Sequence, residues 1–357
     1  MLLIINSGST SLKYKLFKLP NLREIQSGYI ENIGQKGCAK NHEEALKFAL
    51  KKIVTRYKLY VIRCVGHRIV HGGDWFTRPT KVTPKILKKL EKYNKLAPLH
   101  NPPNLDGIKA SQKLMPKVAN FACFDTAFHR TLPEYIFRYA LPEKYFKKYS
   151  LRRFGFHGLS HQYSASEAAK KLKKPLGKLK IITCHLGGGS SICAIKNGKS
   201  IETSMGFTPA EGLIMASRCG DIDPTISLFL QKKERLTPDE MDKILNFESG
   251  ILAICGEKNW LKVLARLRRG DKRAKLAFDM FCHRVKKYIG AYYAILGGLE
   301  ALVFTGAIGS GDSLTRSEIC RGLPFLGSSA SKGVKIFAIK TNEELMIAKE
   351  IVALLHC

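Results

Sequence analysis

Two segments half a chain apart share one plan, in which an apolar strand, a loop of small polar residues and a second apolar strand follow one another. The loop is 6–11 in the first segment and 185–191 in the second. Glycine lets the backbone turn tightly and approach a ligand, while N–H groups and hydroxyls donate to anionic oxygens. One such loop also occurs in ordinary hairpins. Two in corresponding places predict a duplicated, kinase-like fold that holds a phosphate compound between its halves.

Strand-like and helix-like runs alternate along the chain, which predicts an α/β fold. Asn197 and Gly198 indicate a hairpin turn. Helix starts are predicted at Thr83, Asp223 and Thr237, each a capping residue before proline. The predicted strands are 2–5, 11–18, 59–66, 118–124, 180–185, 190–196, 301–305 and 334–339. A long helix is predicted over 271–296, with Ala277, Met280, Phe281, Val285 and Ile289 on its buried face, and a last helix from about Asn342.

Composition limits the class of protein. A chain of 357 residues is long enough for two domains, and 45% hydrophobic with 25% charged residues is typical of a soluble globular protein. No apolar run approaches the roughly 20 residues of a membrane helix, and the N-terminus lacks a basic leader. Ten cysteines are scattered without a C-x-x-C pair. We therefore expect a cytoplasmic protein whose strand cysteines (Cys64, Cys123, Cys184 and Cys193) are buried free thiols.

The formal net charge of +31 allows three interpretations. Lysine and arginine are spread along the whole chain, as in 85–95, 170–180 and 266–273, which is typical of solvated helix faces. Steering of anionic substrates is a second interpretation, and binding to nucleic acid is a third. Because the charge is not concentrated, we expect a basic surface rather than a nucleic-acid partner.

Several polar residues stand where predicted strands or loops end. Arg68 follows a strand and precedes a Gly-Gly turn, so it could bind phosphate or carboxylate, or form a surface ion pair. Asp125 also follows a strand and could hold Mg²⁺ or cap a helix. Arg218 precedes a predicted helix start, and the glycine-rich segment 304–312 follows an apolar strand as a nucleotide loop would.

Three histidines, His100, His157 and His185, lie in Gly- or Pro-rich loops. Zinc is the obvious rival interpretation, but no histidine pair has helical i, i+4 spacing and no cysteine completes a ligand pattern. The chain contains neither G-x-x-x-x-G-K-[ST] nor the glycine loop, lysine and H-R-D features of protein kinases. A phosphate-handling enzyme outside those two classes is therefore indicated.

Nearly end to end, the chain resembles the acetate kinases, relatives of the sugar kinases, actin and the heat-shock ATPases. The motifs that carry the resemblance are 6–13, 66–73, 98–104, 124–129, 154–161, 185–191, 205–209, 218–224 and 341–344. The resemblance implies two duplicated actin-like (ribonuclease H-like) domains with a cleft between them. It places 1–128 plus about 343–357 in an N-terminal domain, and 129–342 in a C-terminal domain for nucleotide binding and dimerisation.

By resemblance, the activity is a reversible, Mg²⁺-dependent transfer of phosphate from ATP to acetate, giving acetyl phosphate and ADP, with Mn²⁺ as a possible substitute metal. Asp125, Arg68, Arg218 and His157 would be catalytic, the last two stabilising the transition state. Asn6 and Glu343 would help hold the metal. Substrate-binding residues would be Arg68, Val70, Leu99, His100, Phe156 and Pro209. Residues facing the nucleotide would be Lys13, His185, Leu186, Gly187, Gly188, Gly189, Arg284, Gly306, Ala307, Ile308, Gly309 and Ser310.

The chemistry of a carboxylic acid agrees with this assignment. With a pKa of about 4 the acid is already an anion at neutral pH, so no general base is needed. The obstacle is repulsion between the carboxylate and a polyanionic phosphate, which Arg68, Arg218 and Mg²⁺ would neutralise. Asp125 is then better interpreted as a metal or water organiser than as a base.

Departures from the family pattern gather on the nucleotide side. The chain is shorter than most acetate kinases, Gly188 stands where the family has Asn, and 249–256 and 305–312 depart from their usual forms. An altered nucleotide preference or pyrophosphate as donor are the alternatives to ATP, and propionate is the near alternative to acetate. The alternative from a different class of protein is a non-catalytic relative that binds nucleic acid. A homodimer is expected from the resemblance alone.

Overall fold

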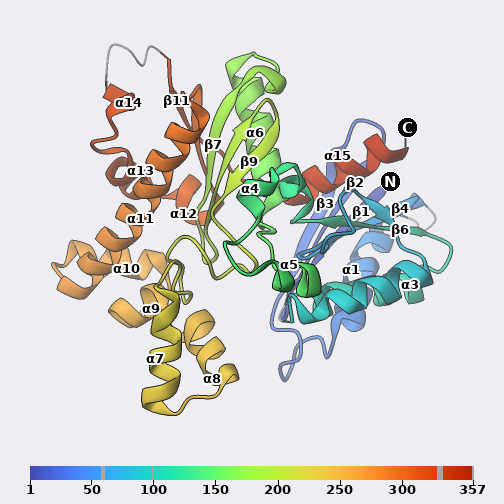
Figure 1. Ribbon diagram of the computed structural model, residues 1–357. Helices are drawn as coiled ribbons and strands as arrows, with labels where there is room; N and C mark the ends of the chain where they lie inside the picture. Colours follow the sequence, from blue (N-terminus) through green and yellow to red (C-terminus); the bar gives the residue numbers. More distant parts are fainter. Residues whose placement is uncertain (58–60, 99, 328–332, 356–357) are drawn as a thin grey trace. The chain divides into compact units, whose positions relative to one another are not determined.

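The computed structural model describes residues 1–357 except 58–60, 99, 328–332 and 356–357 (Figure 1). Contacts divide the chain into two compact units. The first unit comprises Met1–Arg130, Phe156–Leu159 and Asn342–Cys357, and the second comprises Thr131–Gly155 and Ser160–Thr341. Each unit is built on one mixed β-sheet. Within the described residues, no helix is long and apolar enough to cross a membrane.

The sheet of the first unit has the order β3-β2-β1-β4-β6-β5. Strands β1, β2 and β3 are antiparallel neighbours, while β1, β4 and β6 run parallel. The turn between β1 and β2 is closed by a hydrogen bond of 2.8 Å from Gly8 N to Ser11 O. The strands are β1 (Leu2–Ser7), β2 (Leu12–Lys18), β3 (Arg23–Ile30), β4 (Cys64–Ile69), β5 (Thr80–Lys81) and β6 (Ala119–Phe124).

Helices cover both faces of this sheet, with α1 (His42–Arg56) and α3 (Asn101–Leu114) on one face and α15 (Glu343–Leu355) on the other (Figure 1). Strand β1 is apolar without alternation because it is covered on both sides. Leu3 and Ile5 pack in the core that contains α1. Gly66 on β4 lets α15 approach, since a Cβ there would lie 2.5 Å from Ile351. Helix α2 (Pro84–Glu91) begins after Thr83, as predicted.

The sheet of the second unit repeats this pattern. Read from its antiparallel end, the order is β9-β8-β7-β10-β11, with β7, β10 and β11 parallel. Three antiparallel strands followed by parallel ones occur in both sheets, so the predicted duplication is confirmed. The strands are β7 (Lys180–His185), β8 (Ser191–Lys196), β9 (Lys199–Thr203), β10 (Ala301–Thr305) and β11 (Lys335–Ala338).

The longest helix, α11 (Lys272–Leu296), anchors the core of the second unit. Ala277, Phe281 and Val285 are buried as predicted, whereas Met280 is 39% exposed and lies at the edge of the apolar stripe. Capping side chains begin α7, α8 and α11 at the predicted positions. The other helices are α4 (Glu134–Phe137), α5 (Glu143–Tyr149), α6 (Gly158–Leu172), α7 (Pro224–Glu234), α8 (Pro238–Lys243), α9 (Gly250–Cys255), α10 (Trp260–Arg268), α12 (Gly306–Gly311), α13 (Ser313–Cys320) and α14 (Pro324–Gly327).

Three local predictions differ from the structure. The strand predicted at 59–66 is β4, which begins only at Cys64 and includes Arg68; 58–60 lie outside the described residues. Strand β3 was not predicted, because an edge strand with half-exposed polar residues lacks an apolar signal. The segment 306–311, predicted to be a loop, forms the short helix α12.

Candidate active site

Two parallel strands bring an arginine and an aspartate together in the first unit. Arg68 lies near the end of β4, and Asp125 follows β6, its hydrogen-bonded neighbour. Arg68 Nη2 is 2.6 Å from Asp125 Oδ2, and Arg68 Nε donates to Oδ1 at 3.0 Å. Asp125 is 1% exposed. A third group joins them from the far end of the chain, because Arg68 Nη1 lies 3.0 Å from Glu343 Oε2.

The charges in this cluster do not cancel, since one guanidinium stands between two carboxylates. Burial raises the pKa of Asp125, and Arg68 lowers it only in part because the Glu343 carboxylate raises it again. Burial lowers the pKa of Arg68, but the adjacent Asp125 and Glu343 charges outweigh it, so the net shift is upward and Arg68 stays a cation. The cluster therefore keeps negative charge that a bound cation would balance.

A second acidic group stands next to the first. Glu344 is fully buried, and its Oε1 lies 3.0 Å from Lys13 Nζ. Asn6 Nδ2 donates to the same oxygen at 3.4 Å. Asn6 and Lys13 thus both bond to Glu344, a residue to which the sequence reasoning gave no site role. Its place beside Glu343 in the first turn of α15 was the available signal.

The donors in this region suit a hard cation. Among the described residues, no group of three or more His, Cys, Asp or Glu side chains forms a metal-holding cage. Mg²⁺ does not require one, because it keeps several waters and is held by one or two carboxylates together with substrate phosphates. Glu343, Asp125 and the amide oxygen of Asn6 are donors of that kind and fit such a site.

Two buried asparagines fix the segment that follows β4. Asn104 Oδ1 accepts from Val70 N at 3.0 Å, while Asn104 Nδ2 donates to Ser7 O at the end of β1. Asn101 binds both the N–H and the carbonyl of His71, each at 3.0 Å. Sequence reasoning gave the segment 98–104 only a substrate role. It missed the hydrogen bonds of Asn101 and Asn104, which we call the asparagine clamp. His100 stands just before α3, and Leu99 lies outside the described residues.

The loop that carries His157 is pressed against Asp125. Gly158 N donates to Asp125 O at 2.9 Å, and a Cβ on Gly158 would lie 2.1 Å from that oxygen, so only glycine allows this approach. His157 itself has a positive φ of 56°, an uncommon conformation for a histidine. Phe156 is buried, and its carbonyl accepts from His129 Nε2 at 2.9 Å. The backbone that follows His157 therefore lies against the backbone of Asp125.

In the second unit, the two glycine-rich segments are bonded to one another. Ile308 N and Gly309 N donate to Leu186 O at 2.9 and 3.1 Å. Gly306 has a φ of 78°, and a Cβ there would lie 2.4 Å from Leu186 O. His185 ends β7, and its Nδ1 lies 2.7 Å from Ser160 Oγ. The predicted nucleotide segments thus form one connected structure.

A cavity of about 480 Å³ opens beside these segments. Trp260 forms part of the wall, and its Nε1 donates to Thr315 Oγ1 at 3.1 Å. Gly188 has nothing within 4 Å of where a Cβ would stand. Of the predicted nucleotide residues, Gly187, Gly188, Ala307 and Ile308 line the cavity. Gly311 and Asp312, from the predicted nucleotide segment 304–312, also line it, whereas the sequence reasoning missed the remaining lining residues: Met215, Ala216, Ile251, Lys258, Asn259, Trp260, Leu261 and Phe281.

Arg218 lies on a loop whose base is held by Asp221. Gly212 N donates to Asp221 Oδ1 at 2.8 Å, and Tyr288 donates to Oδ2 at 2.7 Å. Arg284 Nη1 donates to the carbonyls of Gly212 and Asp221, each at 3.2 Å. In this structure Arg284 thus supports the loop. Arg218 is half-buried, which lowers the pKa of its guanidinium. The half-buried Pro209 also belongs to the second unit.

Comparison with known proteins decides the family. The model of the acetokinase family matches residues 1–349. The chain belongs to the acetokinase family. Members are phosphotransferases with a carboxyl group as acceptor, and their fold is the actin-like α/β arrangement seen here in two copies.

Curated relatives agree over nearly the whole length. The chain is 44% identical to the acetate kinase of Carboxydothermus hydrogenoformans, over 98% of this chain and 97% of the relative. It is 46% identical to the acetate kinase of Dictyoglomus turgidum, over 98% of this chain and 96% of the relative. These alignments span 387 and 390 positions, more than the 357 residues of this chain, so it is shorter than its relatives, as predicted.

Solved structures of the acetokinase type are also similar. The acetate kinase of Porphyromonas gingivalis superimposes with a TM-score of 0.90 at 37% identity, covering 99% of both chains. A propionate kinase from Francisella tularensis superimposes with a TM-score of 0.92 at 36% identity, covering 98% of both. Similarity of fold therefore does not separate acetate from propionate as the substrate.

Proposed function

We propose that the protein is an ATP-dependent acetate kinase. The observation that carries the proposal is the buried cluster of Arg68, Asp125 and Glu343 at the ends of β4 and β6 and the start of α15. Its guanidinium can bind a carboxylate or a phosphoryl oxygen, and its surplus negative charge suits a divalent cation.

Acetate arrives as an anion and needs no base. One of its oxygens bonds to the γ-phosphorus while the bond from that phosphorus to the bridging oxygen of ADP breaks, giving acetyl phosphate and ADP. The role of the chain is to hold the reactants in line and to offset their charge. We assign that role to Arg68, Arg218 and His157, with Asp125 orienting Arg68 by accepting hydrogen bonds from its Nε and Nη2.

We assign the metal site to Glu343, Asn6 and Asp125. Bound Mg²⁺ would neutralise phosphoryl oxygens and orient them. Lys13 holds Glu344 in place next to this site, with an Nζ–Oε1 distance of 3.0 Å. Mn²⁺, which accepts the same oxygen donors, would substitute.

The cavity in the second unit supports a nucleotide donor. Its volume of about 480 Å³ and its apolar lining suit a nucleoside, whereas pyrophosphate has no apolar part to place there. Space is open where a Cβ on Gly188 would stand, so this position leaves the cavity wall unobstructed. We therefore propose ATP rather than pyrophosphate as the donor.

Acetate is proposed over propionate on the basis of its pocket. Asn104 holds the backbone of the half-buried Val70, and Phe156 is 1% exposed, so neither can easily move to admit a longer acid. One methylene is worth about 1–3 kcal/mol in such a pocket. We expect propionate to react more slowly rather than not at all.

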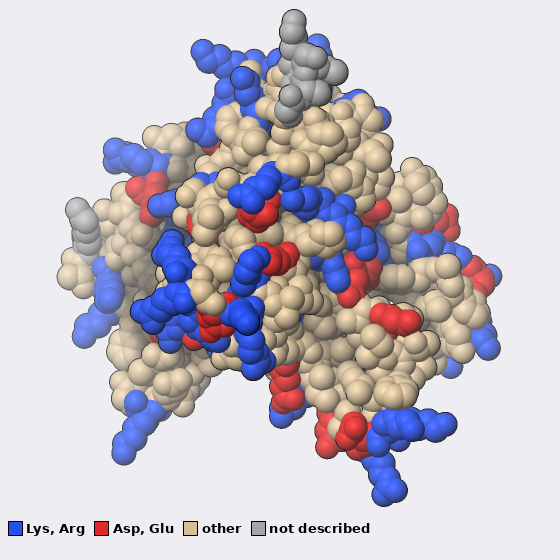
Figure 2. Space-filling model, turned by 90° about the vertical axis from the view of Figure 1, so that its left-hand side faces the viewer, with Lys and Arg blue, Asp and Glu red and all other residues tan. Residues whose placement is uncertain are grey.

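The distribution of charge does not favour a nucleic-acid-binding relative. Figure 2 shows basic side chains interspersed with acidic ones over the visible face. The residues predicted for catalysis are all present. We further propose that the protein acts in the cytoplasm as a homodimer formed through the second unit.

The proposal is tested by trapping acetyl phosphate as its hydroxamate, with acetate or propionate as acceptor and ATP, GTP or pyrophosphate as donor. Turnover with ATP and acetate that is lost in Arg218→Ala supports the proposal. Turnover with pyrophosphate alone would replace ATP as the donor. Absence of turnover with every pair would contradict the kinase activity, and binding to DNA with a steep salt dependence would then support the nucleic-acid alternative.

A further inference from the structure

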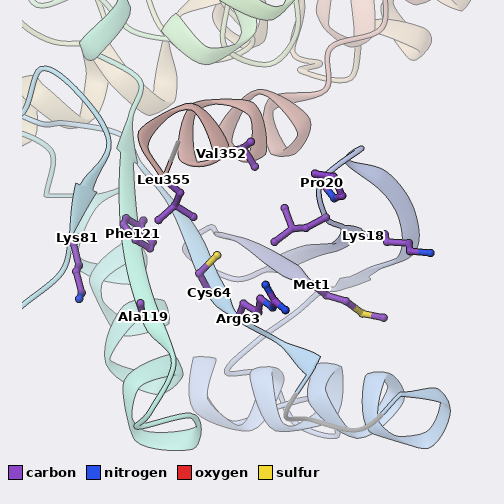
Figure 3. A pocket seen from close by; sticks show the side chains of 11 residues that line it. Met1, Lys18, Pro20, Arg63, Cys64, Lys81, Ala119, Phe121, Val352 and Leu355 are labelled. Atoms are coloured by element: carbon purple, nitrogen blue, oxygen red, sulfur yellow. The ribbon is translucent and has the colours of Figure 1, made fainter. Parts of the chain in front are cut away.

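A second cavity, of about 840 Å³, lies wholly within the first unit (Figure 3). Its floor is the starting end of the central strands, at Cys64 of β4 and Ala119 of β6. The proposed catalytic residues stand at the opposite ends of these strands, since Arg68 is near the end of β4 and Asp125 follows β6. This cavity is therefore separate from the proposed active site.

The walls of the cavity are largely apolar. Val352 and Leu355 come from α15, Phe121 from β6, and Leu19 and Pro20 from the turn after β2. Figure 3 shows Pro20, Phe121, Val352 and Leu355 around the cavity, with α15 above the strands in this view. The volume lies in the range of about 300–1,000 Å³ found for sites that bury a small organic ligand.

Among the described residues that line this cavity, the charged side chains are all basic. Lys18, Arg63 and Lys81 line it, and no Asp or Glu is among the described lining residues. Within the described part of the chain, none of these three forms an ion pair with a carboxylate. Arg63 adjoins Cys64, between Lys18 on one side and Lys81 on the other (Figure 3). Three unneutralised cations beside an apolar cavity attract an anion that also has an apolar part.

We propose that this cavity binds a fatty carboxylate of medium chain length. The guanidinium of Arg63 would hold the carboxylate, because its fork matches two carboxylate oxygens. The acyl chain would pack against Pro20, Phe121 and Val352, where burial of each CH₂ is favourable. Lys18 and Lys81 would add to the positive potential without contacting the ligand directly.

Helix α15 gives this site a route to the catalytic cluster. The same helix begins with Glu343, which pairs with Arg68, and ends with Leu355, which lines the cavity. A ligand that packs against Val352 and Leu355 changes the contacts of one end of a rigid element, and displacement of the other end would alter the Arg68–Glu343 pair. This consequence rests on the proposed function, whereas the binding itself does not.

Binding is tested by calorimetry with decanoate below its micellar concentration, with decanol and decyltrimethylammonium as controls. We expect saturable binding of decanoate, binding of decanol at least about tenfold weaker and none of the cation. Equal binding of decanoate and decanol would overturn the role of Arg63. Absence of saturable decanoate binding would overturn the site.

Exposed positions offer variants that leave the core intact. Arg63→Gln should weaken decanoate binding about tenfold, and Lys199→Gln on β9 of the second unit should not. Leu355 is 52% exposed, so Leu355→Glu and Leu355→Lys form a matched pair of opposite charge. The glutamate should weaken binding and the lysine should preserve it. Equal effects of the two would contradict an anionic ligand.

Coupling is measured as the change in KM for acetate when decanoate is added. A change of at least about threefold that Arg63→Gln abolishes would support transmission through α15. A change that persists in Arg63→Gln would mean competition at the acetate site and would overturn the coupling. If the protein lacks kinase activity, the calorimetric result still decides the binding site.

Discussion

Arg68 on β4 forms an ion pair with Glu343, the first residue of the last helix, with an Nη1–Oε2 distance of 3.0 Å. The pair joins residues that lie far apart in the chain. The cluster around Asp125 is therefore complete only after α15 has packed onto the sheet, which couples formation of the proposed catalytic site to folding of the first unit.

Replacing Glu343 should separate catalysis from stability. In Glu343→Gln the carboxylate that balances Arg68 and contributes to the proposed metal site is lost, so we expect kcat to fall about 100-fold and the Mg²⁺ requirement to rise. The melting temperature should change little, because the amide oxygen of glutamine has the same shape and can still accept a hydrogen bond from Arg68. The hydroxamate assay across a Mg²⁺ titration measures this, and Glu24→Gln, in the exposed Lys15–Glu24 pair, is the control. An unchanged Mg²⁺ requirement would remove Glu343 from the metal site.

The asparagine clamp should matter for both stability and substrate affinity. Asn104→Ala removes the partners of Val70 N and Ser7 O, and leaving buried groups unpaired costs about 1–3 kcal/mol each. We expect a lower free energy of unfolding in urea and a higher KM for acetate, because the backbone of Val70 is released. Asn21→Ala, in an exposed turn, should change neither. An unchanged KM with reduced stability would limit the clamp to a structural role.

The two glycine-rich segments allow a matched pair of substitutions. Gly306→Ala places a Cβ 2.4 Å from Leu186 O at a φ of 78°, so it should be strained and weaken ATP binding. Gly311→Ala has open space and an ordinary φ and should be tolerated. Gly188→Asn, which restores the family residue, should also be tolerated. Calorimetric titration with ATP compares the three, and equal losses for Gly306→Ala and Gly311→Ala would contradict the packing argument.

Buried histidines should make the protein less stable in acid. Burial lowers the pKa of His67 from 6.5 to about 4, despite its hydrogen bond with Asn120. The unfolded histidine takes up a proton near pH 6.5 and the native one only near pH 4. The free energy of unfolding therefore falls as pH falls through this window, by up to about 3 kcal/mol for His67.

Urea unfolding at about pH 7 and about pH 5 measures this loss. His67→Gln should reduce the difference in the free energy of unfolding between the two pH values. Replacement of the exposed His283 by glutamine should leave that difference unchanged. An identical pH dependence in both variants would show that other groups cause the loss. Burial also lowers the pKa of His71 to about 4, so His71 would be the next position to replace.

Much of the architecture could be predicted from local sequence. The repeated strand, loop and strand segments predicted the duplicated sheets, because an apolar strand followed by a small-residue turn requires few distant contacts. Proline after Thr83, Asp223 and Thr237 predicted helix starts for a similar reason, since a cap bonds its own first turn. Arg68 and Asp125 were predicted one by one from their positions near strand ends.

What the sequence by itself determined is therefore where strands, turns and helix caps form and which side chains carry charge at strand ends. Only the tertiary structure decided which side chains pair with one another. Glu344 with Lys13, Asn104 with Val70 and Ser7, and Asp221 with Arg284 join residues far apart in the chain. Such partners are set by how sheets and helices pack, and a carboxylate or amide has the same local appearance whether it will meet a cation or solvent.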